Sequence, residues 1–179
     1  MRSKSLRLRE CGFTVLEILT VLVVISILAT MVFASYSALR DKARRASCIN
    51  NLLNLHVGMA SYLTDHDGLW PQIPNDNLRD PAFAMGWVNV LRPYKLTEIN
   101  WICPSVQAAL GVNYMTYPRL DYLPTPFGTQ ARAAYQYGTQ PWFVERADIH
   151  GDGNLLIFAN GSIKSINQAF SDAFQQSTQ

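Results

Sequence analysis

The strongest pattern in the chain is an apolar run near its N-terminus. From Phe13 to Phe33, 21 residues contain a single charged side chain, Glu17. As a helix this run would be about 31 Å long, which matches the hydrocarbon core of a bilayer. It exceeds the roughly 7–15 apolar residues of a secretory signal. We therefore expect residues 13–33 to form a membrane-spanning helix.

The helical pattern continues beyond the apolar run. No proline occurs from Phe13 to Asp67, and Gly58 is the one glycine in that range, so a single helix of about 50 residues is predicted. Residues 34–67 are expected to form an amphipathic continuation that ends at Asp67-Gly68, with Gly68 as the C-terminal cap. The predicted buried stripe consists of Tyr36, Leu39, Ala43, Ala46, Ile49, Leu53, Val57, Ala60 and Leu63.

Residues 68–167 are punctuated by proline and glycine, which predicts a small, loop-rich globular region. A short helix is expected at 87–91, with weak strands at 112–117 and 132–137. The segments 154–158 and 162–166 flank Asn160-Gly161 and predict a hairpin with a type I′ turn. Residues 168–179 are polar and are expected to be a flexible tail. The predicted fold class is α+β, a long helix packed against a small antiparallel sheet.

Charge divides the chain at Gly12. The first twelve residues carry four basic side chains and one acidic one, whereas the rest contains 11 Lys and Arg against 12 Asp and Glu. A basic surface for nucleic acid is therefore not expected after residue 12. Because the N-terminal charges lie closest to the apolar run, we expect the N-terminus in the cytoplasm and the C-terminal region in the periplasm.

Glu17 is a candidate functional residue, since a carboxylate inside an apolar span is costly unless it is neutralised. Cleavage between Gly12 and Phe13 would create an amine at Phe13, four residues away, which could pair with Glu17 in the same subunit or in a neighbour. The alternative is a lone carboxylate near the interface that is protonated or reaches water.

The segment from Gly12 to Glu17, Gly-Phe-Thr-Val-Leu-Glu, resembles the prepilin signature of type IV pilins and type II secretion pseudopilins. Val15 stands where leucine is commoner. The resemblance implies cleavage after Gly12 by a prepilin peptidase, N-methylation of Phe13, and a role for Glu17 in assembly. It also implies other pilin subunits and an inner-membrane assembly platform as partners, an inner-membrane location, and an extracellular one if a pilus forms.

Several later segments resemble a subgroup of pilin-like proteins of planctomycete and verrucomicrobial type. The most diagnostic is His150 followed, after nine residues, by Asn160-Gly161, where the subgroup usually has Asp-Gly. The other similar segments are 47–52, 62–71, 87–94 and 102–105.

Two groups of side chains leave their chemistry open at this stage. If the cut after Gly12 removes Cys11, then Cys48 and Cys103 remain, either as a disulfide or as two buried thiols. The pattern Asp148-x-His150-x-Asp152-Gly153 is similar to the start of a calcium loop, although Ala159 stands at the position that needs an acidic ligand. The alternative is a structural turn with His150 bonded to backbone.

No motif indicates an enzyme. The chain has no G-x-S-x-G and no glycine-rich phosphate loop, and His56, His66 and His150 lack zinc-ligand spacing. Apart from calcium, no cofactor is expected. Four tryptophans could form a binding surface, but a core role is favoured.

The favoured function is a structural filament subunit. The alternatives are a periplasmic binding module with an uncleaved anchor and a DNA-uptake minor pilin.

Overall fold

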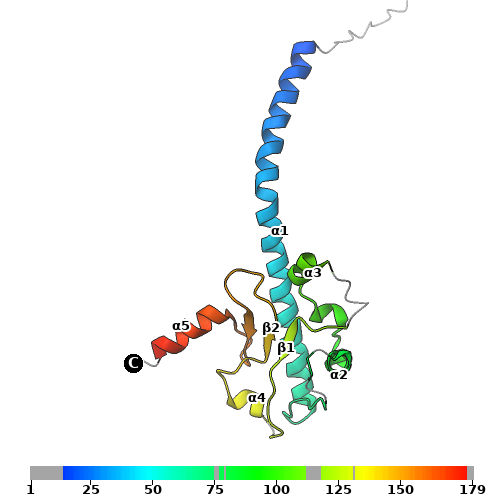
Figure 1. Cartoon of the computed structure of the whole chain (residues 1–179), viewed down its shortest axis with the longest axis vertical. Helices are drawn as coiled ribbons and strands as arrows, with labels where there is room; N and C mark the ends of the chain where they lie inside the picture. The colour runs from blue at the N-terminus through cyan, green and yellow to red at the C-terminus, as the bar shows by residue number, and fades with distance from the viewer. Residues whose placement is uncertain (1–13, 75–76, 79, 112–117, 131, 177–179) are drawn as a thin grey trace, which may run out of the picture. The chain divides into compact units, whose positions relative to one another are not determined.

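The computed structural model describes residues 14–74, 77–78, 80–111, 118–130 and 132–176, with no side-chain description at 34, 35 and 176 (Figure 1). The chain divides into two compact units at Arg40–Asp41, and each is described by itself. Helix α1 (Val15–Asp65) contains residues of both units. The prediction of one long N-terminal helix is confirmed, and the α+β fold class with a small antiparallel sheet is confirmed as well.

In the first unit, three hydroxyl side chains of α1 bond to the helix's own backbone. The hydroxyls of Thr20, Ser26 and Thr30 donate to backbone carbonyls three or four residues earlier, at 2.7–2.9 Å. Such back-bonding leaves few polar groups in need of water. The first half of α1 is therefore suited to an apolar environment although it contains hydroxyl groups.

In the second unit, a stripe along α1 forms one side of the core. Cys48, Leu52, Leu55, Met59 and Leu63 are all buried, at intervals of three and four residues, as on one face of a helix. The predicted stripe was therefore placed on the wrong face for most of its length. Leu63 is buried and Ile49 and Ala60 pack against the core, but the other described members are exposed: Tyr36, Leu39, Ala43, Ala46, Leu53 and Val57.

The end of α1 lies close to its predicted position, but Asp67 has a positive φ as well as Gly68. Asp67 adopts φ 55° and Gly68 φ 76°, and the Gly68 N–H donates to the Leu63 carbonyl at 2.7 Å. This six-residue bond is typical of a Schellman motif whose C′ residue is Asp67. Gly68 is the residue after it, so the cap is one position earlier than predicted.

The sheet is a four-stranded antiparallel meander in the order β1-β2-β3-β4. Its strands are β1 (Tyr122–Pro124), β2 (Phe143–Glu145), β3 (Leu155–Ile157) and β4 (Ile163–Ser165). The predicted C-terminal hairpin is confirmed by the β3–β4 pairing. Its turn type differs from the prediction: Gly161 has φ 77° while Asn160 is not at positive φ, and the Gly161 N–H bonds to the Phe158 carbonyl. This is a three-residue loop with glycine in the left-handed position.

The remaining elements are short helices. They are α2 (Pro81–Leu91), the 3-10 helices η1 (Arg92–Tyr94) and η2 (Glu98–Trp101), α3 (Pro104–Leu110), α4 (Ala133–Gln136) and α5 (Ile166–Gln176). In the view of Figure 1, α2 and α3 lie on one side of α1 and α5 on the other. The predicted strand at 132–137 is wrong, because α4 occupies it, and the strand predicted at 112–117 lies outside the described residues.

Helix α5 shows that residues 168–176 of the predicted flexible tail at 168–179 are helical, and residues 177–179 lie outside the described residues. Ser165 and Gln168 form a capping box: the Ser165 N–H donates to Gln168 Oε1, and the Gln168 N–H donates to Ser165 Oγ. Lys164 additionally pairs with Asp172 at 2.6 Å. These contacts satisfy the first turn of the helix and offset the cost of ordering a polar segment.

Candidate functional site

Glu17 lies in the first turn of α1, in the first unit. Its N–H donates to Thr14 Oγ1 at 3.2 Å, so Thr14 acts as the N-cap and Glu17 is the third helical residue. A carboxylate in this turn is favoured by the helix dipole. The predicted cut between Gly12 and Phe13 lies outside the described residues, so the pairing of Glu17 with a Phe13 amine stays a prediction.

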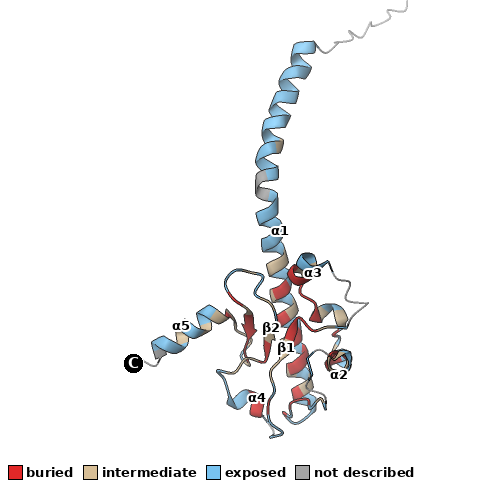
Figure 2. Cartoon of the chain, viewed as in Figure 1, coloured by how far each residue is buried: buried red, intermediate tan, exposed pale blue. Residues whose placement is uncertain are grey.

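The apolar side chains that follow Glu17 on α1 have unusually large exposed fractions. Leu19, Leu22 and Leu28 are each more than half exposed, and Figure 2 shows most of the described first half of α1 in the colour of exposed residues. Within the described residues, α1 is the one helix long and apolar enough to cross a membrane. Its first half therefore presents a continuous apolar surface to whatever surrounds it.

In the second unit, Cys48 and Cys103 form a disulfide with their Cα atoms 5.2 Å apart. Cys48 comes from α1, and Cys103 is the N-cap residue of α3. The backbone beside each is fixed by a buried polar group. Tyr122 donates its hydroxyl to the Cys48 carbonyl at 3.2 Å, and the Cys103 N–H donates to Asp121 Oδ2 at 2.9 Å.

Beside the disulfide lies a buried contact between a carboxylate and an imidazole that the sequence did not predict. Glu145, at the end of β2, has no exposed surface, and its Oε1 lies 3.1 Å from His150 Nε2. Its Oε2 accepts the Leu155 N–H at 3.3 Å. Burial raises the pKa of Glu145, and His150 opposes this effect. Burial, followed by the charge of Glu145, also raises the pKa of the neighbouring Tyr122.

Each of the three expected calcium ligands has a partner within the protein, and calcium binding stays a prediction. Asp148 Oδ1 accepts the Gly153 N–H, Asp152 Oδ2 pairs with Arg45 on α1 at 2.6 Å, and His150 turns inward to Glu145. The three side chains thus have three different partners. His150 also differs from the alternative considered above, because its Nε2 faces a carboxylate and not the backbone.

The other two histidines have separate structural contacts. His56 Nε2 lies 3.0 Å from the Ala159 carbonyl, and its ring stacks on Trp142. His66 stacks on Tyr62. All four tryptophans are at most 4% exposed, so their predicted core role is confirmed.

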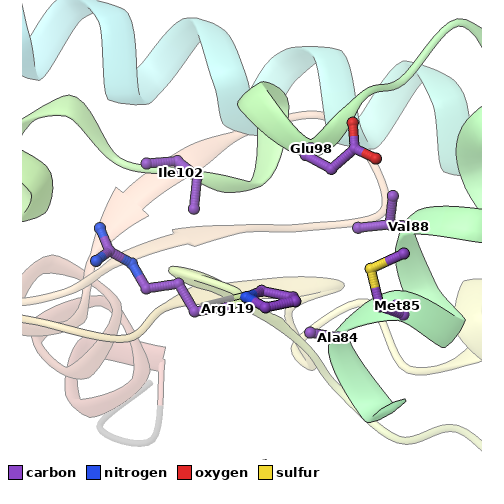
Figure 3. Close-up of a pocket in the computed structure, with 7 residues that line it drawn as sticks. Ala84, Met85, Val88, Glu98, Ile102 and Arg119 are labelled. Atoms are coloured by element: carbon purple, nitrogen blue, oxygen red, sulfur yellow. The ribbon is translucent and has the colours of Figure 1, made fainter. Parts of the chain in front are cut away.

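A hollow next to α2 is lined by two charged side chains, Glu98 and Arg119, and each is paired within the protein. Figure 3 shows Ala84, Met85 and Val88 of α2 on one side of it and Arg119 on another. The Arg119 guanidinium pairs with Asp121, and Glu98 pairs with Arg92 at 2.8 Å. The charges that line this hollow are therefore already engaged within the protein.

Comparison with known families finds a match at the N-terminus. Residues 7–33 match the family described as the prokaryotic N-terminal methylation motif. The chain therefore carries a prepilin-type methylation motif, which supports a type IV pilin-like family and a prepilin peptidase substrate. No curated protein matches the chain. No solved structure matches it either.

Proposed function

We propose that the protein is a structural subunit of a type IV pilus-like filament or type II secretion pseudopilus. A prepilin peptidase cuts after Gly12, the new amine of Phe13 is methylated, and the 13–33 helix anchors the subunit in the inner membrane with its second unit in the periplasm. The helix then packs with its equivalents in the filament. The observation that carries this proposal is the methylation motif on a helix whose apolar side chains are exposed.

Glu17 is assigned the role of selecting the neighbouring subunit. In a low-dielectric filament interior an isolated carboxylate is strongly disfavoured, whereas a pair with the amine of a neighbouring Phe13 is stabilised. The position of Glu17 in the first turn of α1 brings it near the start of the helix, where that amine would lie. Pairing would thus favour one axial register between subunits.

Processing is tested by the intact mass of the protein purified from its native membrane. A chain that begins at Phe13 and carries one additional methyl group is expected. A chain that retains residues 1–12 would contradict the proposal and favour a membrane-anchored binding module.

Assembly is tested by Glu17→Ala, with Asp41→Ala as the matched control because Asp41 is an exposed acidic residue on the same helix. We expect both variants to reach the membrane and only Glu17→Ala to be depleted from sheared filaments. Normal incorporation of Glu17→Ala would refute the assigned role.

A further inference from the structure

Four side chains with metal-binding atoms converge in the second unit. They are Cys48, Cys103, Glu145 and His150, and one ligand atom from each lies within 4.8 Å of the others. They come from four different places in the chain: α1, the start of α3, the end of β2 and the loop after β2. Three of the four residues are buried and His150 is partly buried. The cluster therefore differs from a chance grouping of charged side chains on the surface.

We propose that the dithiol form of this protein binds one zinc ion through Cys48 Sγ, Cys103 Sγ, His150 Nε2 and Glu145 Oε1, and that the disulfide form does not. Two thiolates, one imidazole and one carboxylate make a donor set that zinc accepts in tetrahedral geometry. The inference is independent of the filament role.

The dimensions of the cluster fit this assignment. Zinc bond lengths of about 2.0–2.3 Å place tetrahedral ligand atoms about 3.3–3.8 Å apart. The Glu145 Oε1 to His150 Nε2 distance of 3.1 Å is close to that range, and the spread of the whole cluster stays within 4.8 Å. Small side-chain shifts would therefore bring all four atoms to one centre.

The surrounding contacts hold the residues that would bind zinc in place, while Glu145 Oε1 and His150 Nε2 bond to each other and Cys48 Sγ contacts Ser105 Oγ at 3.8 Å. Glu145 Oε2 accepts the Leu155 N–H, which leaves Oε1 directed at His150. The backbone of Cys103 is fixed by Asp121, and that of Cys48 by Tyr122. Supporting hydrogen bonds of this kind orient metal ligands and raise affinity.

The two forms exclude each other because they use the same sulfur atoms. A dithiol reductant would convert the disulfide to two thiols, with transfer of two electrons and two protons and oxidation of the reductant to its own disulfide. Zinc then displaces the two thiol protons. In the oxidised chain only Glu145 and His150 remain as donors, which are too few to hold the ion.

The experiment uses the full-length chain in detergent with Cys11→Ser, so that two thiols remain. Samples reduced with a phosphine and samples left oxidised are mixed with Zn²⁺ alone, desalted, and analysed for bound zinc and for alkylation of the thiols. We expect one zinc per reduced chain, protection of both thiols, and no retention by the oxidised chain. Co²⁺ in place of zinc should show thiolate-to-cobalt charge-transfer absorption.

His150→Gln and Glu145→Gln should each weaken zinc binding at least about tenfold, whereas His66→Gln, an exposed histidine outside the cluster, should not. A reduced chain with Cys11→Ser as its single substitution that retains no zinc, or that leaves its thiols open to alkylation when zinc is present, would overturn the proposal. Equal binding by all three variants would overturn it too. The measurements on the chain with Cys11→Ser alone do not depend on whether the His150 and Glu145 variants fold.

Discussion

Leucine side chains of α1 are exposed in the first unit, whereas most of those in the second unit are buried. Leu22 in the first unit is 59% exposed, whereas Leu52 in the second is fully buried. In the second unit the apolar stripe of α1 is covered by the sheet and by short helices of the same chain. In the first unit, nothing described in the chain covers the apolar surface.

Leucine thus stabilises the folded second unit in one half of α1, and in the other half, under the proposed function, it stabilises contact with lipid or with another subunit. Burial of the second-unit stripe contributes to folding, at about 25 cal/mol per Å² of apolar surface. The apolar surface of the first unit contributes nothing to folding within one chain. It stabilises the subunit only where lipid or another subunit replaces water, as the proposed function requires.

The largest effects are expected from the same substitution in each unit. Leu52→Asp buries an uncompensated charge and should cost more than about 4 kcal/mol, enough to unfold the second unit. Leu22→Asp should leave that unit folded but weaken membrane insertion by about 3 kcal/mol.

The four tryptophans all lie in the second unit, so near-ultraviolet circular dichroism reports its packing, and carbonate extraction reports anchoring. Loss of the tryptophan signal in Leu22→Asp would show that packing of the second unit depends on Leu22, contrary to this prediction.

The disulfide should have the next largest effect, and only on the second unit. It joins residues separated by 55 positions, and its removal by Cys48→Ser with Cys103→Ser should cost about 2–4 kcal/mol of unfolding free energy. Denaturant unfolding in metal-free buffer, followed by tryptophan fluorescence, measures this loss. The result of carbonate extraction should be unchanged. A loss of membrane anchoring would show that the effect of the disulfide is not confined to the second unit.

The sequence predicted the features that depend on local pattern. The long helix follows from an apolar run without proline, and the β3–β4 hairpin follows from Asn160-Gly161 between two apolar segments. Helix α5 could have been predicted too, since Ser165 and Gln168 have capping-box spacing, but its polar composition suggested a tail. Each of these signals lies within a few residues.

The sequence did not predict features that depend on tertiary packing. The second half of α1 has apolar residues on more than one face, so the choice between Leu52 and Leu53 for the core depends on what packs there. Glu145 is a single acidic residue in a short strand, and no local pattern marks its pairing with His150. The loop after β2 must fold before that pair exists.

The loop that carries His150 allows a smaller and more local test. Gly153 has φ 88°, and a Cβ there would collide with Ile166 Cγ2, whereas Gly151 has φ 80° and open space around it. Gly151→Ala should cost about 1 kcal/mol from backbone strain alone. Gly153→Ala should cost about 1–3 kcal/mol more because of the collision. Thermal unfolding of the two variants measures the difference, and equal losses would mean that the close approach to Ile166 is not needed.

The smallest expected effect concerns the part of α1 just beyond the boundary between the units. Arg45 pairs with Asp152 at 2.6 Å, while the adjacent Arg44 reaches only Asp41 on its own helix, at 3.4 Å. Both pairs are partly exposed to solvent, so Arg45→Ala should destabilise the second unit by only about 0.2–1 kcal/mol more than Arg44→Ala. That difference should shrink when salt is raised, because salt screens exposed charges. Denaturant unfolding at low and high salt provides the measurement. A loss as large as that caused by removing the disulfide would mean that the stabilising contacts of the second unit begin at Arg45 and not, as the buried stripe indicates, at Cys48.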